Sequence, residues 1–194
     1  MGIVRMGMPT ELVSKLQKAY NVQLFVETGT YQGNTALWAA EHFQTVITIE
    51  ASPEIYAQVV ATHSQVKNVK FLYGHSKEQL ATLVPSMNEP CIFWLDGHWC
   101  GGVSYGEEDE CPLLEELLII NRSAQDHFIL IDDARLFLNP PPPPHRTEQW
   151  PNINAVLDLL AANRSRYTSV FEDVIVSVPE SAKSVVAEYL LSPN

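Results

Sequence analysis

The sequence predicts an α/β fold built on a doubly wound, mainly parallel, seven-stranded sheet with helices on both faces. Short apolar runs alternate with amphipathic stretches, which is the spacing of parallel βαβ units. Several of these runs end in an acidic residue, among them Glu27, Glu50 and Asp96. In an open parallel sheet the ligand crevice lies outside the carboxyl ends of the strands, where the strand order reverses. We therefore expect these carboxylates to share one pocket.

The individual elements follow from local patterns along the chain. Apolar residues recur on one helical face over 9–20 and predict a first helix there. Ser52 and Pro53 are suited to the N-cap and first turn of a helix. Residues 91–96 form a continuous apolar run, as expected of a strand covered on both faces. The other elements are expected as strands over 22–27, 45–50, 69–73, 127–132, 166–171 and 173–178, and as helices over 33–43, 53–63, 76–84, 112–122 and 151–163, followed by a short C-terminal helix.

Composition limits the class of protein and its partners. The 194 residues are expected to form a single domain over 1–194, with an N-terminal helix within 1–20 and a proline-rich loop at 136–151. The formal net charge of −11 argues against nucleic acid or an anionic membrane as partner, because phosphate binding needs clustered Lys and Arg. No apolar stretch has the length of a bilayer span, and residues 1–10 lack the apolar core of a signal peptide. The three cysteines form no CxxC pair, so we expect a cytoplasmic protein without disulfide framework or zinc site.

A glycine-containing turn follows the first predicted strand. Within Phe25–Thr35, the residues Glu27, Gly29 and Gly33 match the pattern acidic-x-Gly-x-x-x-Gly. Glycine lets the backbone turn sharply and approach a ligand, and the following helix start adds exposed N–H groups. The spacing is not that of the dinucleotide fingerprint GxGxxG. The segment resembles the first motif of class I S-adenosylmethionine-dependent methyltransferases, with an ordinary strand-to-helix turn as the alternative.

That resemblance implies a Rossmann-like fold with S-adenosylmethionine as cofactor. Glu50 ends the next strand, 23 residues after Glu27, where the family places an acidic residue that accepts both ribose hydroxyls. Ser76 lies in a turn that resembles the Gly-x-Ser adenine contact of catechol-type O-methyltransferases, although it also suits a helix N-cap. The cofactor-binding residues implied are Glu27, Thr28, Gly29, Thr30, Gly33, Glu50, Ala51, His75, Ser76 and Asp96.

Three aspartates at neighbouring strand ends, Asp96, Asp132 and Asp133, suggest a metal site. Crowded carboxylates resist ionising together, and their oxygens suit a hard divalent cation such as Mg²⁺. The arrangement resembles metal-dependent small-molecule O-methyltransferases of the catechol and macrocin types. In those enzymes an Asp after the fourth strand and an Asp-Asp or Asp-Asn pair after the fifth hold the metal. The alternative is that one of these aspartates binds the cofactor or caps a turn.

The sequence departs from the catechol type at the general base. That type has a lysine shortly after its first metal-binding aspartate, whereas the stretch here is Gly97-His98-Trp99-Cys100. His98 is the natural substitute, since an imidazole can take a hydroxyl proton near neutral pH. Hydrogen bonding within the loop or metal ligation are alternative roles for His98. Asp96 and His98 are therefore the candidate catalytic residues.

Two loops are expected beside this pocket. The loop 97–110 ends in the acidic run 107–110, which is expected to be solvated surface, with a lid over the pocket as the alternative. The five prolines at 140–144 favour a polyproline II rod of about 15 Å. The rod is expected to act as a spacer or as a rim of the substrate mouth, with a partner-binding ligand as the alternative. The other rim residues would be His145, Arg146 and Trp150.

The function that these patterns predict is methyl transfer from S-adenosylmethionine to a small-molecule hydroxyl, assisted by a divalent metal. The glycine turn and aspartates also resemble cephalosporin-hydroxylase-type proteins, so a different enzyme on the same scaffold is one alternative. A non-catalytic cofactor-binding module is another. An exposed edge strand near the C-terminus would permit a homodimer.

Overall fold

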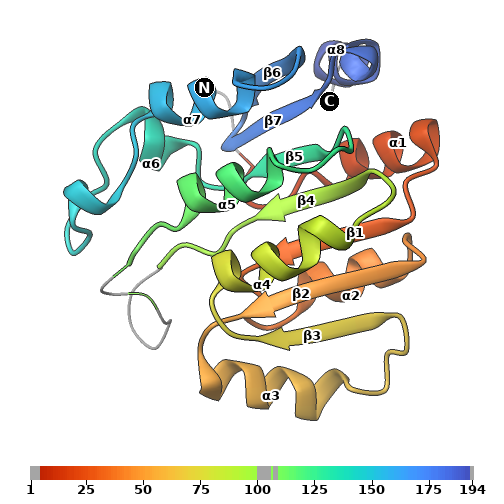
Figure 1. The fold of residues 1–194 in the computed structure, drawn as a ribbon, viewed down its shortest axis with the longest axis vertical. Coiled ribbons are helices and arrows are strands. Elements are labelled where there is room, and N and C mark those ends of the chain that lie inside the picture. Colours follow the sequence, from red (N-terminus) through yellow and green to blue (C-terminus); the bar gives the residue numbers. More distant parts are fainter. Residues whose placement is uncertain (1–4, 100–105, 107–108, 193–194) are drawn as a thin grey trace.

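The chain folds around one seven-stranded sheet, shown in Figure 1. The computed structural model describes residues 5–99, 106 and 109–192. The strands are β1 (Leu24–Thr28), β2 (Thr45–Glu50), β3 (Val69–Tyr73), β4 (Cys91–Leu95), β5 (Phe128–Ile131), β6 (Arg166–Phe171) and β7 (Val174–Pro179). They lie in the order β3-β2-β1-β4-β5-β7-β6, so the order reverses between β1 and β4. The predicted doubly wound sheet is confirmed, and its crevice belongs at the β1–β4 junction.

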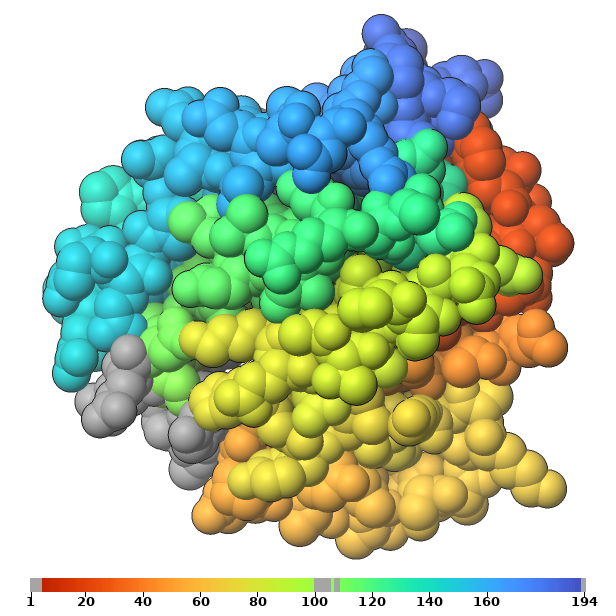
Figure 2. Space-filling view, in the orientation of Figure 1, coloured from red at the N-terminus to blue at the C-terminus, as the bar shows by residue number. Residues whose placement is uncertain are grey.

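Helices cover both faces of the sheet, as predicted. They are α1 (Thr10–Tyr20), α2 (Asn34–Ala40), α3 (Pro53–His63), α4 (Ser76–Leu83), α5 (Leu113–Ile120), α6 (Arg135–Leu138), α7 (Ile153–Ala161) and α8 (Lys183–Leu191). Apolar side chains of α4, α5 and α7 pack on one face, and those of α1, α2 and α8 pack on the other. Figure 2 shows α4, α5 and α7 side by side across the first face. Two apolar layers therefore enclose the sheet, and the loops at the strand ends are left to form a site.

Strand pairing brings the candidate residues to one edge. β1 to β5 pair in parallel, and β7 lies antiparallel between β5 and β6. All five residues of β4 are buried, as expected of a strand covered on both faces. Thr28 of β1 is in register with Ile49 of β2 and Leu95 of β4. The residues that follow these three strands therefore meet at the same edge of the sheet.

Two helix starts near this edge differ from one another. At α3 the Ser52 hydroxyl accepts a hydrogen bond from the Ile55 amide at 3.4 Å, and Pro53 occupies the first turn, as predicted. At α4 the N-cap is His75, and Ser76 is already the first helical residue. The alternative role of Ser76 as an N-cap is therefore wrong. This position leaves the Ser76 side chain available to other partners.

The proline-rich segment contains more structure than the predicted loop. α6 and a 3₁₀ turn at Thr147–Gln149 occupy its two ends. The amide of His145 donates a hydrogen bond to the carbonyl of Pro142 at 3.1 Å, which closes a turn within the segment. The prediction of an uninterrupted polyproline II rod is therefore wrong. The physical reason is a buried anchor, described below, to which the chain returns directly after the prolines.

Other features of the described residues bear on single predictions. None of the described helices is long and apolar enough to span a bilayer. Cys91 and Cys111 are buried free thiols, whereas Cys100 lies outside the described residues. β6 forms one edge of the sheet, as predicted for an exposed edge strand near the C-terminus. Dimerisation through it stays a prediction.

His127 is a buried polar residue that ties β5 to β4. Its Nδ1 accepts a hydrogen bond from the Cys91 amide at 3.2 Å, and its Nε2 lies 2.8 Å from the Ser123 hydroxyl. This pattern requires the neutral ring with the proton on Nε2. Burial lowers the pKa of His127 to about 4, and the charges of Arg164 and Arg166 act in the same direction.

The shifted His127 predicts a pH dependence of stability. The unfolded chain binds more protons than the folded one between pH 6.5 and about 4, so the free energy of unfolding falls as the pH drops through this range. Its contribution is fully present above pH 6.5. We expect His127→Gln to remove about 3 kcal/mol of that fall, measured by urea unfolding at each pH. His63→Gln is the control, and an unchanged pH dependence in His127→Gln would contradict the prediction.

Candidate functional site

The acidic residues that follow the strands meet at the carboxyl edge of the sheet, as predicted. Burial raises the pKa of Glu27, and the charges of Asp96 and Glu50 raise it further. Burial likewise raises the pKa of Asp96, with further contributions from Asp132 and Asp133. The carboxyl groups at the carboxyl ends of β1, β2, β4 and β5 therefore lie close enough to affect one another's ionisation.

The turn after β1 brings backbone against backbone. Gly29 has a φ of +83°, and its amide donates to the carbonyl of Ile49 at 3.0 Å. A Cβ on Gly29 would lie 2.1 Å from the carbonyl oxygen of Asp96, so only glycine fits there. Gly33, with a φ of +79°, is the N-cap of α2. The two glycines thus let the turn pack closely on its neighbours, Gly29 on the loop after β4 and Gly33 on Val59 of α3.

Glu50 is oriented by two backbone amides. Its Oε2 accepts a hydrogen bond from Tyr31 N and its Oε1 accepts one from Ser52 N, both at 2.9 Å. The residue is 7% exposed, and Ala51 beside it is half-buried. Each carboxylate oxygen keeps a second lone pair, so two neighbouring hydroxyl groups can still donate to it. The geometry therefore suits the predicted ribose contact.

Glu27, by contrast, is engaged within the sheet. It is 1% exposed, and its Oε2 accepts a hydrogen bond from the Thr48 hydroxyl at 2.6 Å. The Thr48 hydroxyl also lies 2.6 Å from that of Thr30. Burial raises the pKa of Glu27 to about 8, although the bond from Thr48 opposes it. Glu27 and Thr30 thus hold the glycine turn in place, and Thr28 does the same through its hydroxyl, which accepts from the Asp96 amide at 3.2 Å.

His98 links two of the aspartates predicted to bind metal. Its Nε2 lies 2.6 Å from Oδ2 of Asp133, and its Nδ1 lies 3.8 Å from Oδ1 of Asp96. The other Asp133 oxygen accepts a hydrogen bond from Nη1 of Arg135 at 2.5 Å. Arg135 also pairs with Asp173, whose carboxylate accepts a hydrogen bond from the Arg135 amide at 2.9 Å. Asp133 is therefore held between an imidazole and a guanidinium.

Burial and these partners determine the protonation of the cluster. Burial raises the pKa of Asp96 to about 7 and that of Asp132 to about 6. Burial acts likewise on Asp133, but His98 and Arg135 outweigh it and lower the pKa of that residue. Burial alone would lower the pKa of His98, yet the hydrogen bond to Asp133 and the charge of Asp96 raise it. The His98–Asp133 pair is therefore the charged part of the cluster, and Asp96 can hold a proton near neutral pH.

The donor set does not fit the predicted metal centre. Both oxygens of Asp133 are engaged by His98 and Arg135, and one oxygen of Asp132 accepts from the Asp133 amide at 2.8 Å. Over 5–99, 106 and 109–192, no three His, Cys, Asp or Glu side chains are arranged to hold a metal ion. The imidazole and guanidinium supply the positive charge that a cation would bring. A metal role for Asp96, Asp132 and Asp133 is therefore not supported.

One member of the acidic run is buried, contrary to the expected solvated surface. Glu110 accepts hydrogen bonds from Trp150 Nε1 at 2.7 Å and from the Arg146 amide at 3.0 Å, and Nδ1 of His145 lies 3.3 Å away. Burial opposes its ionisation, but these donors lower the pKa of Glu110. The Trp150 ring packs 5.3 Å from the His98 ring. Glu110 thus anchors the segment after the prolines as a rim beside His98.

Glu116 is a site residue that the sequence analysis missed. It is 1% exposed, and burial raises its pKa to about 7, partly offset by the hydroxyls of Ser76 and Thr28. A Cβ on Gly97 would lie 3.4 Å from its Oε1, so Glu116 lies directly under the loop after β4. The sequence holds one signal of its burial, because Glu116 lies on the apolar face of α5. The buried positions of that helix are Leu113, Glu116, Leu117 and Ile120.

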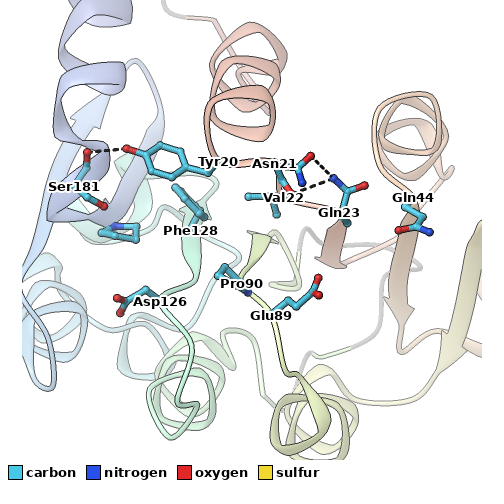
Figure 3. Close-up of a pocket in the computed structure, with 11 residues that line it drawn as sticks. Tyr20, Asn21, Val22, Gln23, Gln44, Glu89, Pro90, Asp126, Phe128 and Ser181 are labelled. Carbon is cyan, nitrogen blue, oxygen red and sulfur yellow. Dashed lines mark hydrogen bonds between the residues drawn. The ribbon is translucent and has the colours of Figure 1, made fainter.

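A hollow of about 490 Å³ lies at the opposite, amino edge of the sheet, and Figure 3 shows its lining. Two pairs of its polar residues are engaged with one another: the Tyr20 hydroxyl donates to the Ser181 carbonyl at 2.6 Å, and Nε2 of Gln23 donates to Oδ1 of Asn21 at 2.8 Å. Glu89 and Asp126 are its acidic residues, and no His or Cys lines it. The chemistry of the described residues therefore gathers at the carboxyl edge.

Comparison with known proteins identifies the fold. No protein-family model and no curated protein matches the chain. The structure named "putative caffeoyl-CoA O-methyltransferase", from Staphylococcus aureus, matches with a TM-score of 0.61 and 14% identity, over 91% of this chain and 86% of that one. This chain has a methyltransferase fold.

Two further structures with the methyltransferase fold show its range. An SAH-bound methyltransferase from Podospora anserina has a TM-score of 0.57 and 18% identity, over 90% of this chain and 80% of its own. The N-methyltransferase NodS from Bradyrhizobium japonicum has a TM-score of 0.53 and 14% identity, over 88% of this chain and 94% of its own. At these identities the shared feature is the fold, and it does not select the acceptor.

The close contact at Gly29 predicts a severe effect of one methyl group. We expect Gly29→Ala to abolish cofactor binding and to lower the melting temperature, because its Cβ would overlap the Asp96 carbonyl oxygen. Gly7→Ala is the matched control, since Gly7 has a φ of +80° but a Cβ added there would meet no atom within 4 Å. It should show only the cost of a left-handed residue, about 1–2 kcal/mol. An equal fall in melting temperature and in cofactor affinity in the two variants would contradict the role of the contact between Gly29 and the Asp96 carbonyl.

Proposed function

We propose that the chain is an S-adenosylmethionine-dependent methyltransferase that acts on a hydroxyl group of a small molecule. The observation that carries this proposal is the Gly29 turn beside a Glu50 carboxylate held by two backbone amides. A carboxylate fixed in this way accepts the paired hydroxyls of a ribose. The fold shared with an SAH-bound methyltransferase supports the same cofactor.

The charge of the crevice also supports this cofactor. The carboxyl groups of Glu27, Asp96 and Asp132 all have a raised pKa, first through burial and then through one another. A positive charge placed among them favours their ionised forms. S-adenosylmethionine carries a sulfonium charge, whereas a phosphate-bearing cofactor would meet like charges. The crevice therefore discriminates in favour of a cationic nucleoside.

The residues have separate roles in this proposal. The glycine turn receives the cofactor at the start of α2, Glu50 and Ala51 hold the ribose, and His75 and Ser76 lie toward the base. When bound, the cofactor supplies an electrophilic methyl group. Asp96, whose side chain is 32% exposed, would serve as a hydrogen-bonding group beside the cofactor.

Proton removal is assigned to His98. Its neutral ring would accept the proton of the acceptor hydroxyl, and Asp133 would stabilise the imidazolium that results. Arg135 holds Asp133 in place from the other side. We assign no step to a metal, because these two basic side chains engage Asp133 and no three described side chains of His, Cys, Asp or Glu are arranged to hold a metal ion. The rim with Trp150 and His145 would shape the entry for an uncharged acceptor.

Calorimetry tests the cofactor site. We expect wild-type protein to bind S-adenosylmethionine at micromolar concentration, and Glu50→Ala to weaken binding at least about ten-fold by removing a charged hydrogen-bond acceptor. Glu41→Ala, at an exposed position after α2, is the control. We expect Mg²⁺ titrated alone to give no saturable heat. A saturable heat of Mg²⁺ binding that is lost in Asp133→Ala would support the predicted metal centre after all. Absence of S-adenosylmethionine binding by the wild-type protein would refute the proposed function.

A pH–rate profile tests His98, with labelled methyl transfer to a panel of small hydroxyl compounds as the readout. The wild-type rate should rise with pH through the pKa of His98, which lies above its ordinary 6.5, because only the neutral ring accepts a proton. We expect His98→Gln to lower the rate about 100-fold. Asp133→Asn should move the rise to lower pH, since it removes the partner that raises this pKa. An unchanged profile in His98→Gln would rule out the assignment.

A further inference from the structure

The hairpin that joins β6 to β7 has a buried carboxylate at its tip. Glu172 and Asp173 form the two-residue turn between Phe171 and Val174, which pair with one another. Aspartate is common in tight turns, but it is almost never fully buried unless it is paired. Asp173 is only 3% exposed. Its burial is therefore to be explained by the groups that it binds.

Asp173 binds the start of α6 at three points. Its carbonyl accepts a hydrogen bond from the Ala134 amide at 2.8 Å, and its Oδ1 accepts one from the Arg135 amide at 2.9 Å. Its Oδ2 forms an ion pair with the Arg135 guanidinium. The antiparallel pairing of β5 with β7 brings these two segments together. Asp173 thus holds both the backbone and the arginine side chain at the start of α6.

The residue that depends on this anchor is Asp133, directly before Ala134. Asp133 has a φ of +55°, a left-handed conformation that costs a residue with a Cβ about 1–2 kcal/mol. Such residues persist where the surrounding structure holds them, and they cluster at functional sites. Its Oδ1 accepts a hydrogen bond from Nη1 of Arg135 at 2.5 Å, and its Oδ2 lies 2.6 Å from Nε2 of His98. The orientation of the His98 ring therefore depends on a strained residue that neighbouring segments hold in place.

We propose that Asp173 is a positioning residue for the base His98. It acts through Arg135 on Asp133, and Asp133 orients the imidazole. The Arg135 side chain is 47% exposed, so without the Asp173 carboxylate its guanidinium could turn to solvent. Asp133 would then lose the partner that fixes its Oδ1. This assignment rests on the proposed function and adds to it a residue that acts through others rather than on the reacting atoms.

A double-mutant cycle tests the assignment, with labelled methyl transfer as the readout. Asp173→Asn keeps an oxygen that can accept from the Arg135 amide, but it removes the charge that holds the guanidinium. We expect kcat to fall at least about ten-fold, while the KM for S-adenosylmethionine stays within about two-fold. In the His98→Gln background the same change should have little further effect, because the group that it positions is absent. Glu172→Gln, in the same turn, is the control and should keep the wild-type kcat.

Nuclear magnetic resonance supplies a second measurement that needs no methyl acceptor. The Hε1 signal of His98, assigned through its loss in His98→Gln, should move in Asp173→Asn at constant pH. It should stay in place in Glu172→Gln, and the signal of His63 should not move in either variant. Arg135→Gln should also move the His98 signal, because Asp173 acts through this arginine. This variant tests the same chain of contacts if Asp173→Asn does not fold.

The outcomes separate this assignment from the proposed function. A His98 signal that stays in place in Asp173→Asn and Arg135→Gln would overturn the assignment alone. An equal fall in kcat with and without His98 would do the same, since Asp173 would then serve only the fold. Absence of S-adenosylmethionine binding by the wild-type protein would overturn the proposed function, and the assignment with it.

Discussion

The close approach of the turn after β1 to the end of β4 is the constraint on which the site depends. Gly29 lies so near the Asp96 carbonyl that a Cβ would come within 2.1 Å of it. The contact requires β1 to be central in the sheet and in register with β2 and β4. Hydrogen bonds that join the side chains of Glu27, Thr48 and Thr30 hold the turn in that position. Glu50 at the end of β2 and the Asp96 loop after β4 then lie on either side of this turn.

Charge balance is the second constraint, and distant parts of the chain provide it. The crevice gathers carboxylates from four strand ends, which would repel one another without compensation. His98 and Arg135 compensate Asp133 directly. Arg135 is in turn held by Asp173, between β6 and β7, whose carbonyl also accepts from the Ala134 amide at 2.8 Å. The antiparallel insertion of β7 beside β5 therefore supports the centre of the site.

Burial of single charged residues gives the site its shape. Glu110 brings the segment after the prolines back to the loop after β4, because its carboxylate accepts hydrogen bonds from the Trp150 indole and the Arg146 amide. Glu116 lies under the same loop from the other side. Both residues are acidic side chains in helical or loop sequence that would ordinarily be solvated, and each is buried where two segments distant in the chain meet.

The sequence by itself determined the alternation of strands and helices, the glycine turn, and the gathering of Glu27, Glu50, Asp96 and Asp132 at one edge. Those features depend on local periodicity and on the general rule that parallel strands end at the same side. Tertiary structure decided what the side chains do there. It directed Glu27 to Thr48, paired His98 with Asp133, buried Glu110, placed Glu116 beside Ser76 and inserted β7 beside β5. The reason is that a residue type specifies which bonds a side chain can make, whereas the partner within reach depends on contacts between segments far apart in the chain.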